Sequence, residues 1–201
     1  MASVVRTEPT VGLEDEAKLV VRARAGDGEA AAELLARHEL VAWRVCRSLL
    51  PAGEDVEAAV QETLLRALRG LPGVAAEAGF SGWLAAIALN YCRDRLRRRR
   101  LVPFLPLEVG ADDDNAGPLA VLPAPGADPE RVSMARQAVA RVRREVARLP
   151  RRQREGFALR FFVGLELEAI AGALSIDVGT VKTHLHRAVH RVRRVAEEAL
   201  P

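Results

Sequence analysis

The sequence has few aromatic residues, almost no lysine and only two cysteines. Aromatic residues make up 4% of the 201 residues, whereas alanine, leucine, valine and arginine dominate, and this balance favours helices over strands. Two cysteines, Cys46 and Cys92, are too few for a disulfide framework or a metal cluster. Because both lie inside helical patterns, we expect them to be buried as small apolar side chains.

The sequence also lacks segments that address a membrane. No apolar stretch approaches the ~20 residues of a membrane span. The first residues, MASVVRTEPTVGLEDE, lack the basic start and the long apolar run of a signal peptide. We therefore expect a cytoplasmic protein without membrane insertion.

The net charge of +3 conceals an asymmetry along the chain. Residues 131–201 hold 15 Lys or Arg and 7 Asp or Glu, which gives +8, whereas residues 1–130 hold 15 and 20, which gives −5. A basic C-terminal part predicts a polyanionic partner, such as a nucleic-acid backbone. Within the acidic N-terminal part, positive charge is concentrated in the RRRR run at 97–100.

Four segments before residue 101 have apolar residues at three- and four-residue spacings, which predicts four helices. Four helices of this length can form a compact bundle that folds alone. We expect Ser81 to cap the last of them, in which Trp83, Ile87 and Tyr91 follow one another four residues apart. The expected core-facing residues of the first three helices are Leu19, Val20, Ala23, Leu34, Leu35, His38, Val41, Ala42, Val45, Val56, Val60, Thr63, Leu64, Ala67 and Leu68.

Residues 101–130 differ in composition from the segments on either side. They carry six of the eleven prolines and an acidic run at 112–114, which is typical of a flexible linker. The predicted fold class is therefore all-α, with two small helical domains joined by that linker. Its parts are an N-terminal tail (1–12), a helical bundle (13–100), the linker (101–130) and a helix-turn-helix domain (131–201).

The segment 165–192 has the layout of a helix-turn-helix. A first helix from Glu166 to Leu174 presents Ile170 and Leu174 inward, and a short turn follows in which Ile176 fills the gap between the helices. Asp177 is a suitable cap for the second helix. The residues of that helix with core-facing spacing are Val181, Leu185, Ala188 and Val192.

This spacing leaves a polar set on the outward face of the second helix. Recognition helices enter the major groove of DNA with their N-terminal part leading. Lys182, Thr183 and His186 are therefore placed to reach base edges, while Arg187, like the later arginines, suits phosphates. A solvated basic face without a specific partner is the alternative interpretation.

A metal site built on the three histidines of this helix does not fit helical geometry. His184 and His186 lie about 200° apart, because each residue turns the helix by ~100°. His186 and His190 are four residues apart, but no carboxylate or cysteine is near them in the sequence. We therefore expect no metal.

Four pieces of the sequence, in order, resemble the extracytoplasmic-function (ECF) group of sigma-70-type RNA polymerase sigma factors. They lie at 15–27, 60–69 (VQETLLRALR), 80–100 (FSGWLAAIALNYCRDRLRRRR) and 149–188, so the resemblance covers most of the chain. It implies a transcription initiation factor that directs core RNA polymerase to promoters and promotes melting of the −10 element. It also implies a protein that is not itself an enzyme and needs no cofactor or small-molecule substrate.

The resemblance further implies three binding sets and a regulator. The set for the β′ coiled coil of core polymerase is Gln61, Glu62, Leu65, Arg66 and Arg69. The set for the −10 element is Val74, Phe80, Trp83, Asn90, Tyr91, Arg93 and Arg97, in which residues 71–80 and Asn90 form a pocket for a flipped base. The set for the −35 element, close to the β flap, is Thr180, Lys182, Thr183, His186, Arg187 and His190. The implied regulator is an anti-sigma factor.

The residue types support these sets to different degrees. A basic track with nearby aromatic side chains is typical of single-strand capture. The third helix, by contrast, has the pattern of an ordinary solvated face with an i,i+4 pair between Glu62 and Arg66. Val74 and Ala75 stand where the family often carries an aromatic residue and an arginine, so we expect thinner contacts with the −10 element.

Two other classes of protein are the alternatives. A stand-alone helix-turn-helix regulator of the response-regulator kind would need a receiver domain, and no strand pattern precedes the helix-turn-helix. A helical adaptor that binds only protein is disfavoured by the +8 charge of residues 131–201. An enzyme is disfavoured because the sequence has no nucleophile–base arrangement and no glycine-rich phosphate loop.

Overall fold

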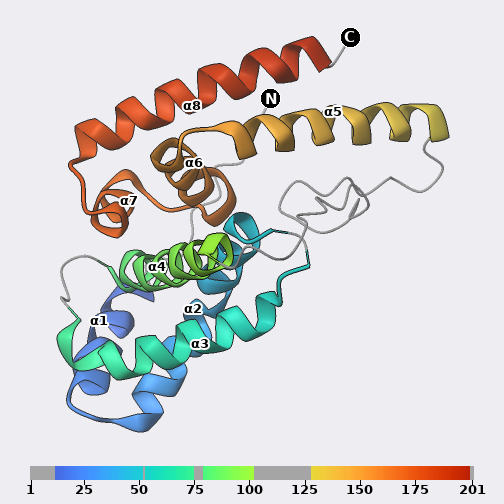
Figure 1. Cartoon of the computed structure of the whole chain (residues 1–201). Helices are drawn as coiled ribbons and strands as arrows, with labels where there is room; N and C mark the ends of the chain where they lie inside the picture. Colours follow the sequence, from blue (N-terminus) through green and yellow to red (C-terminus); the bar gives the residue numbers. More distant parts are fainter. Residues whose placement is uncertain (1–11, 52, 75–78, 102–127, 200–201) are drawn as a thin grey trace, which may run out of the picture.

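The computed structural model describes residues 12–51, 53–74, 79–101 and 128–199. Within these ranges every regular element is a helix and no strand occurs, which confirms the predicted all-α class (Figure 1). The elements are α1 (Gly12–Arg24), α2 (Gly28–Leu49), α3 (Val56–Gly70), η1 (Leu71–Gly73), α4 (Phe80–Leu101), α5 (Pro129–Arg148), α6 (Arg151–Phe157), η3 (Ala158–Val163), α7 (Leu167–Leu174) and α8 (Val178–Ala199). Most of the predicted tail and linker lies outside the described residues.

The N-terminal bundle, α1 to α4, follows most of the predicted hydrophobic pattern. Asp27 and Asp55 cap α2 and α3 by accepting hydrogen bonds from backbone amides of the first turns. One predicted core residue was wrong: Leu68 is 48% exposed, whereas Ala59, which the pattern did not single out, is buried. The buried stripe of α3 consists of Ala59, Val60, Thr63 and Ala67. Leu68 falls outside this stripe, on the solvent side.

Helix α4 is buried on two sides, because it packs against α2 and α3 on one side and against α7 on the other. Its most deeply buried residues are Leu84, Ala85, Ala88, Leu89 and Cys92. The predicted row Trp83, Ile87 and Tyr91 is only partly buried. The predicted cap was also wrong: α4 begins at Phe80, and the Ser81 Oγ lies 3.0 Å from Nδ1 of His38.

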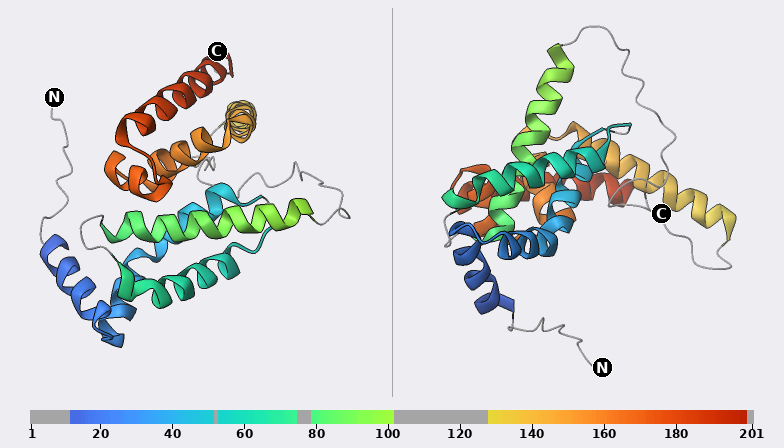
Figure 2. Two further views of the ribbon diagram at one scale, coloured as in Figure 1. Left: turned by 60° about the vertical axis from the view of Figure 1, so that its left-hand side comes forward. Right: turned by 90° about the horizontal axis from the view of Figure 1, so that it is seen from below.

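The C-terminal domain has the predicted helix-turn-helix. Helices α5 and α8 pack side by side, while α6, the π-helical turn η3 and α7 lie between them and the N-terminal bundle (Figures 1 and 2). A small cluster of Val146, Leu149, Phe157, Ala188 and Val192 joins α5, α6 and α8. Across the same contact, Arg191 of α8 donates to a carboxylate oxygen of Glu145 in α5 at 2.6 Å.

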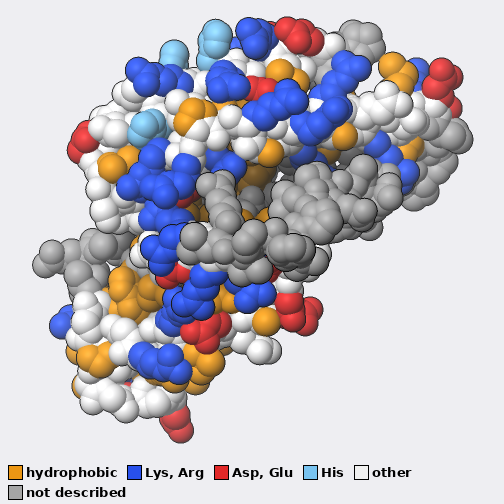
Figure 3. All heavy atoms as spheres, in the orientation of Figure 1, with side chains coloured by type: hydrophobic (Ala, Val, Ile, Leu, Met, Phe, Trp, Pro, Cys, Tyr) orange, Lys and Arg blue, Asp and Glu red, His pale blue; other side chains and the backbone are white. Residues whose placement is uncertain are grey.

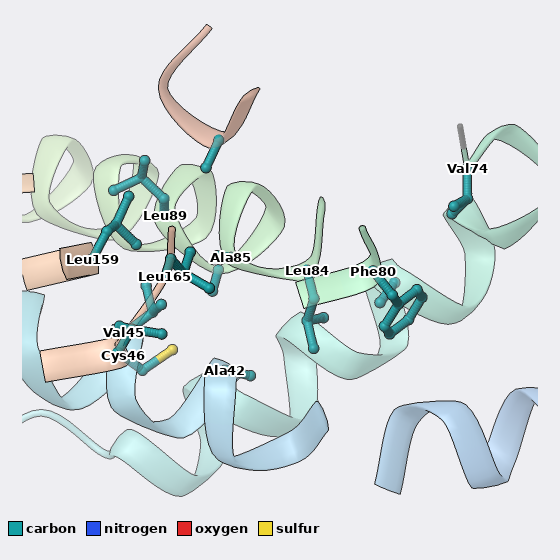
Figure 4. Packing of buried hydrophobic residues seen from close by; sticks show 14 of the residues in the cluster. Ala42, Val45, Cys46, Val74, Phe80, Leu84, Ala85, Leu89, Leu159 and Leu165 are labelled. Atoms are coloured by element: carbon teal, nitrogen blue, oxygen red, sulfur yellow. The ribbon is translucent and has the colours of Figure 1, made fainter. Parts of the chain in front are cut away.

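The two domains share one hydrophobic cluster, which the sequence did not predict. Figure 4 shows Leu159 and Leu165 of the C-terminal domain beside Leu89 of α4, all within the same buried group. The contact between α4 and α7 is close, because a Cβ added at Gly82 would lie 3.2 Å from that of Ala169. Glycine at this position therefore lets the two helices approach each other.

The two cysteines are buried in the N-terminal bundle, as predicted. Cys46 and Cys92 are free thiols with their Sγ atoms 3.9 Å apart. Among the described residues, no helix combines the length and the apolar character that a membrane crossing needs.

Candidate nucleic-acid interface

The start of helix α8 is fixed by the turn that precedes it. Helix α7 ends at Leu174, and Ser175 adopts a left-handed conformation with a φ of 54°. Asp177 then caps α8, as predicted: its Oδ1 accepts from the Thr180 amide at 2.8 Å and its Oδ2 from the Thr180 hydroxyl at 2.6 Å. The hydroxyl bond, followed by the amide bond, lowers the pKa of the Asp177 carboxyl.

The side chains of α8 divide into a buried and an exposed face as the spacing predicts. Val181 and Ala188 are completely buried, and Leu185 is half-buried against the core. The exposed residues of the predicted −35 set are Lys182, Thr183, His186, Arg187 and His190. Thr180 is half-buried, and its hydroxyl already donates to Asp177. The exposed face of α8 is therefore polar and basic, and these side chains do not pack in the hydrophobic core.

The predicted −10 set is less uniform than the −35 set. Val74 and Phe80 are each only 2% exposed, and the Phe80 ring lies 5.2 Å from that of Trp83. Asn90 is exposed, while Tyr91 is half-buried. These side chains thus include two that pack in the core, and Ala75 lies outside the described residues.

Arg93, another residue of the predicted −10 set, is engaged by the C-terminal domain. Its Nε and Nη2 donate to the two carboxylate oxygens of Glu155 at 2.8 and 2.7 Å, and its Nη1 donates to Asn90 Oδ1 at 3.0 Å. The Glu155 side chain is only 3% exposed, and Arg151 and Arg152 approach it at 3.7 Å. A buried carboxylate of α6 therefore holds a predicted DNA contact of α4.

Sequence reasoning did not single out Glu155. The available signal was an isolated acid in the arginine-rich stretch RRQRE at 151–155. A lone acid among arginines is ordinarily a surface residue, so only its burial reveals the contact between the domains.

The arginines at the end of α4 are mostly exposed. Arg95 and Arg99 share Glu54, at 2.8 and 3.0 Å, whereas Arg97 is 72% exposed and contacts Asp94 at 3.1 Å. Figure 3 shows Lys and Arg side chains gathered on the same face of the molecule over both domains. Histidine side chains stand among them above α8. This face has the electrostatic character that a nucleic-acid backbone favours.

The predicted polymerase-binding set lies on the outward side of α3. Gln61 and Arg69 are exposed, and Leu65 is 48% exposed, as is its neighbour Leu68, which the sequence analysis assigned to the core. Two exposed leucines in one turn add an apolar patch to this polar face.

The other two members of the set are tied to a neighbour. Arg66 Nε donates to Glu62 at 2.8 Å, and this contact lowers the pKa of Glu62. The Arg66 guanidinium also lies 5.0 Å from the centre of the Tyr91 ring, in a cation–π arrangement. Arg66 therefore links the α3 surface to the α4 surface.

Nothing in the described part of the chain gathers three or more His, Cys, Asp or Glu side chains into a group that could hold a metal ion. His184 is half-buried, while His186 and His190 point to solvent.

The comparisons with known proteins agree with this arrangement. Residues 34–102 match the family model of sigma-70 region 2, and residues 140–192 match that of sigma-70 region 4. The ECF RNA polymerase sigma factor SigM of Mycobacterium tuberculosis is 32% identical over 192 residues, which cover 93% of this chain and 90% of the relative.

Two solved structures have a similar fold. CnrH in complex with the cytosolic domain of CnrY is 23% identical, with a TM-score of 0.64 and coverage of 91% of this chain and 97% of that one. The sigma factor RpoE in complex with the anti-sigma factor NepR from Bartonella quintana is 21% identical, with a TM-score of 0.60 and coverage of 83% and 96%.

Helices matching regions 2 and 4 in one chain define a sigma-70-type factor. With 32% identity to SigM along almost its whole length, the chain belongs to the ECF group of RNA polymerase sigma factors. Its function is to direct RNA polymerase to promoters and to initiate transcription there.

Proposed function

We propose that the two domains divide promoter recognition between them. The C-terminal domain, residues 131–201, reads the −35 element as duplex DNA. The N-terminal domain, residues 13–100, binds core polymerase and captures the melted −10 element. The observation that carries this proposal is the exposed polar face of α8, which follows directly on a helix-turn-helix with a buried core.

In the −35 complex, the first turns of α8 lie in the major groove. Lys182, Thr183 and His186 offer a cation, a hydroxyl and an imidazole to base edges, while Arg187 and, one turn after His186, His190 lie at the phosphates. Thr180 supports the start of the helix through Asp177, and its hydroxyl must exchange this partner before it can contact DNA.

In the −10 complex, the exposed amide of Asn90 contacts a base that leaves the stack, and Arg97 neutralises the backbone. The buried Val74 and Phe80 shape this surface from behind, while the partly exposed rings of Trp83 and Tyr91 provide stacking faces. These roles match the residue types that single-strand binding uses.

Arg93 changes partner in this proposal. It pairs in a bidentate manner with Glu155, and a DNA phosphate offers an arginine the same two-oxygen geometry. We therefore propose that the domains separate on the promoter and that a phosphate replaces Glu155.

Core polymerase binds through the outward side of α3, where Gln61, Leu65, Leu68 and Arg69 face the β′ coiled coil. Glu62 and Arg66 flank this surface, and the C-terminal domain sits near the β flap. Exposed leucines beside charged groups suit a helical coiled-coil partner, because apolar contact supplies affinity and charge supplies register.

An anti-sigma factor is the regulator that we propose. Two sigma factors of similar fold were solved in complexes, one with the cytosolic domain of CnrY and one with the anti-sigma factor NepR. For this protein, such a partner would hold the closed arrangement of the two domains. The protein would act in the cytoplasm, where promoter DNA is found, and would have no catalytic activity of its own.

Run-off transcription tests the proposal. Fragmented genomic DNA of the source organism is transcribed by bacterial core polymerase with and without the protein, and the new start sites are aligned. Discrete start sites with two shared upstream elements support the division of labour. Start sites with a shared −10 element but no shared −35 element contradict the role of α8, and absence of binding to core polymerase contradicts the role of α3.

A further inference from the structure

A buried histidine joins three helices of the N-terminal bundle. His38 in α2 is only 9% exposed. Its Nδ1 lies 3.0 Å from Oγ of Ser81 in the first turn of α4, and its Nε2 lies 3.3 Å from a carboxylate oxygen of Glu16 in α1. Both ring nitrogens therefore face a polar partner, each from a different helix.

The histidine ring also contacts the aromatic residue that begins α4. The ring centres of His38 and Phe80 are 5.0 Å apart with a tilt of 58°, and Phe80 in turn lies 5.2 Å from Trp83. Tilted aromatic pairs of this kind have a preferred geometry, unlike contacts between aliphatic side chains. A hydrogen bond at Ser81 and a ring contact at Phe80 thus fix two consecutive residues at the start of α4.

Ser81 is available for this contact because it does not cap its helix. A serine hydroxyl at a helix start ordinarily accepts a hydrogen bond from the backbone of its own first turn. Here the hydroxyl is 3.0 Å from a ring on another helix. Buried polar contacts between elements specify one geometry, since a shifted arrangement would leave their groups unsatisfied.

Helix α1 completes the support. It contacts η1, the segment that leads to Val74, and through Glu16 it also contacts His38, which holds Phe80 and Ser81. Val74 and Phe80 are both members of the predicted −10 set, and both are 2% exposed. One unit built from α1 and His38 therefore supports the two buried members of that set.

We infer that His38 is a positioning residue for capture of the −10 element, acting through Ser81 and Phe80 on the start of α4. The inference rests on the proposed role of α4 in −10 capture. His38 touches no DNA in this role; it holds the first turn of α4 through Ser81 and Phe80, while Glu16 of α1 lies beside its other ring nitrogen.

The protonation state of the ring is consistent with this role. Burial lowers the pKa of His38, the neighbouring Glu16 raises it and Arg37 lowers it, and burial is the largest cause. In the neutral ring Nδ1 accepts from the Ser81 hydroxyl, while Nε2 faces the Glu16 carboxylate at 3.3 Å without a hydrogen bond. At neutral pH, His38 therefore connects α1 and α4 without a buried charge of its own.

Ser81→Ala is the variant that tests the inference, because it removes one oxygen and places a good helix former in the helix. Ser81→Thr is the matched control, since it keeps the hydroxyl. With holoenzyme on a promoter found by run-off transcription, abortive initiation separates the closed-complex binding constant from the rate of opening. We expect Ser81→Ala to slow opening by about two- to tenfold, with the binding constant within about twofold and with Ser81→Thr close to the unchanged protein.

His38→Asn gives a second reading, because the Asn amide can replace Nδ1 towards Ser81 but cannot reach Glu16. It is expected to slow opening less than His38→Leu, which removes both contacts. Equal opening rates for Ser81→Ala and the unchanged protein would overturn the inference. So would an equal loss of opening, core binding and thermal stability, because that pattern marks a purely structural residue.

Asn90→Ala, measured in parallel, separates this inference from the proposed function on which it rests. If Asn90→Ala slows opening and Ser81→Ala does not, only the role of His38 fails. If Asn90→Ala has no effect on opening, the assignment of α4 to the −10 element fails first.

Discussion

The two surfaces proposed to bind promoter DNA, on α8 and on α4, differ in how accessible their DNA-contacting side chains are. The face of α8 carries exposed polar side chains over a buried core, and no other helix in the described part of the chain covers Lys182, Thr183 or His186. The face of α4 is partly occupied within the protein, because Arg93 pairs with Glu155 of the C-terminal domain. In the proposed function, a −35 contact can therefore form in the closed arrangement, whereas a phosphate contact of Arg93 requires the two domains to separate.

This difference has an energetic basis. Removing one partner of a buried ion pair is costly, because the remaining charge stays in a poorly solvated place. In the proposed complex with melted DNA, a phosphate takes the place of Glu155 beside Arg93. Glu155 in turn keeps Arg151 and Arg152 nearby, so its charge remains compensated after Arg93 departs. We therefore expect the polyanion to favour separation of the domains.

The largest expected effect comes from substitutions on the exposed face of α8. Lys182→Ala combined with Arg187→Ala removes one base contact and one phosphate contact, so promoter binding by holoenzyme should fall by roughly 100-fold. Binding to core polymerase should stay unchanged in the same preparation. Arg136→Ala is the control, since Arg136 is exposed on α5 of the same domain and belongs to none of the predicted binding sets. Loss of both activities together would instead indicate a misfolded C-terminal domain.

A smaller effect is expected from a substitution on the proposed −10 surface of α4. Asn90→Ala should slow promoter opening by about tenfold, because a flipped base loses a hydrogen bond that forms only after melting. Closed-complex formation, measured by the same abortive initiation assay, should change little. Equal effects on both steps would remove the flipped-base role of Asn90 and make it an ordinary contact with duplex DNA.

The α4 surface is less accessible than the α8 surface because Arg93 pairs with Glu155. Glu155→Gln should therefore make the α4 surface more accessible. Without the carboxylate, Arg93 loses its charged partner across the domains, so the open arrangement gains population. We expect the free protein to bind a single-stranded −10 oligonucleotide roughly fivefold more tightly, since apparent affinity follows the competent fraction. An increase in the radius of gyration should accompany the change.

Glu145→Gln is the matched control for this variant. Glu145 pairs with Arg191 inside the C-terminal domain, so its loss should lower thermal stability without tighter oligonucleotide binding. If both variants bind the oligonucleotide equally well, the contact with Arg93 does not restrain the −10 surface.

The sequence predicted one of the two surfaces better than the other, and the reason is physical. The spacing of Val181 and Ala188 and the cap at Asp177 predicted the orientation of α8 correctly. A helix that packs on one side only buries residues at a single helical period, which the sequence shows directly. Helix α4 packs against α2 and α3 on one side and α7 on the other within one hydrophobic cluster, so its buried residues no longer form a single stripe. Leu68 was misassigned because small residues, Ala59 and Ala67, take the closest positions where α3 packs.

The spacing of apolar residues did not predict the contact between the two domains. The sequence analysis did not single out Gly82, although it is the point where α4 approaches Ala169. It did not single out Glu155 either, and it assigned Ser81 as a helix cap. The role of each residue depends on which helix lies opposite, and periodicity within one helix does not contain that information.

The smallest expected effect is the dependence of thermal stability on the protonation of His38 at acidic pH. Burial lowers the pKa of His38 below its ordinary value of 6.5, so the unfolded chain binds a proton more readily than the folded protein. The contribution of His38 to stability is therefore fully present above pH 6.5 and is lost as the pH falls towards the lowered pKa of the folded state. Between pH 7.5 and 5.5, His38→Gln should lose less of its melting temperature than the unchanged protein. An equal loss in both would show that the pKa of His38 is not lowered in the folded protein, so that its ring is solvated rather than buried between α1 and α4.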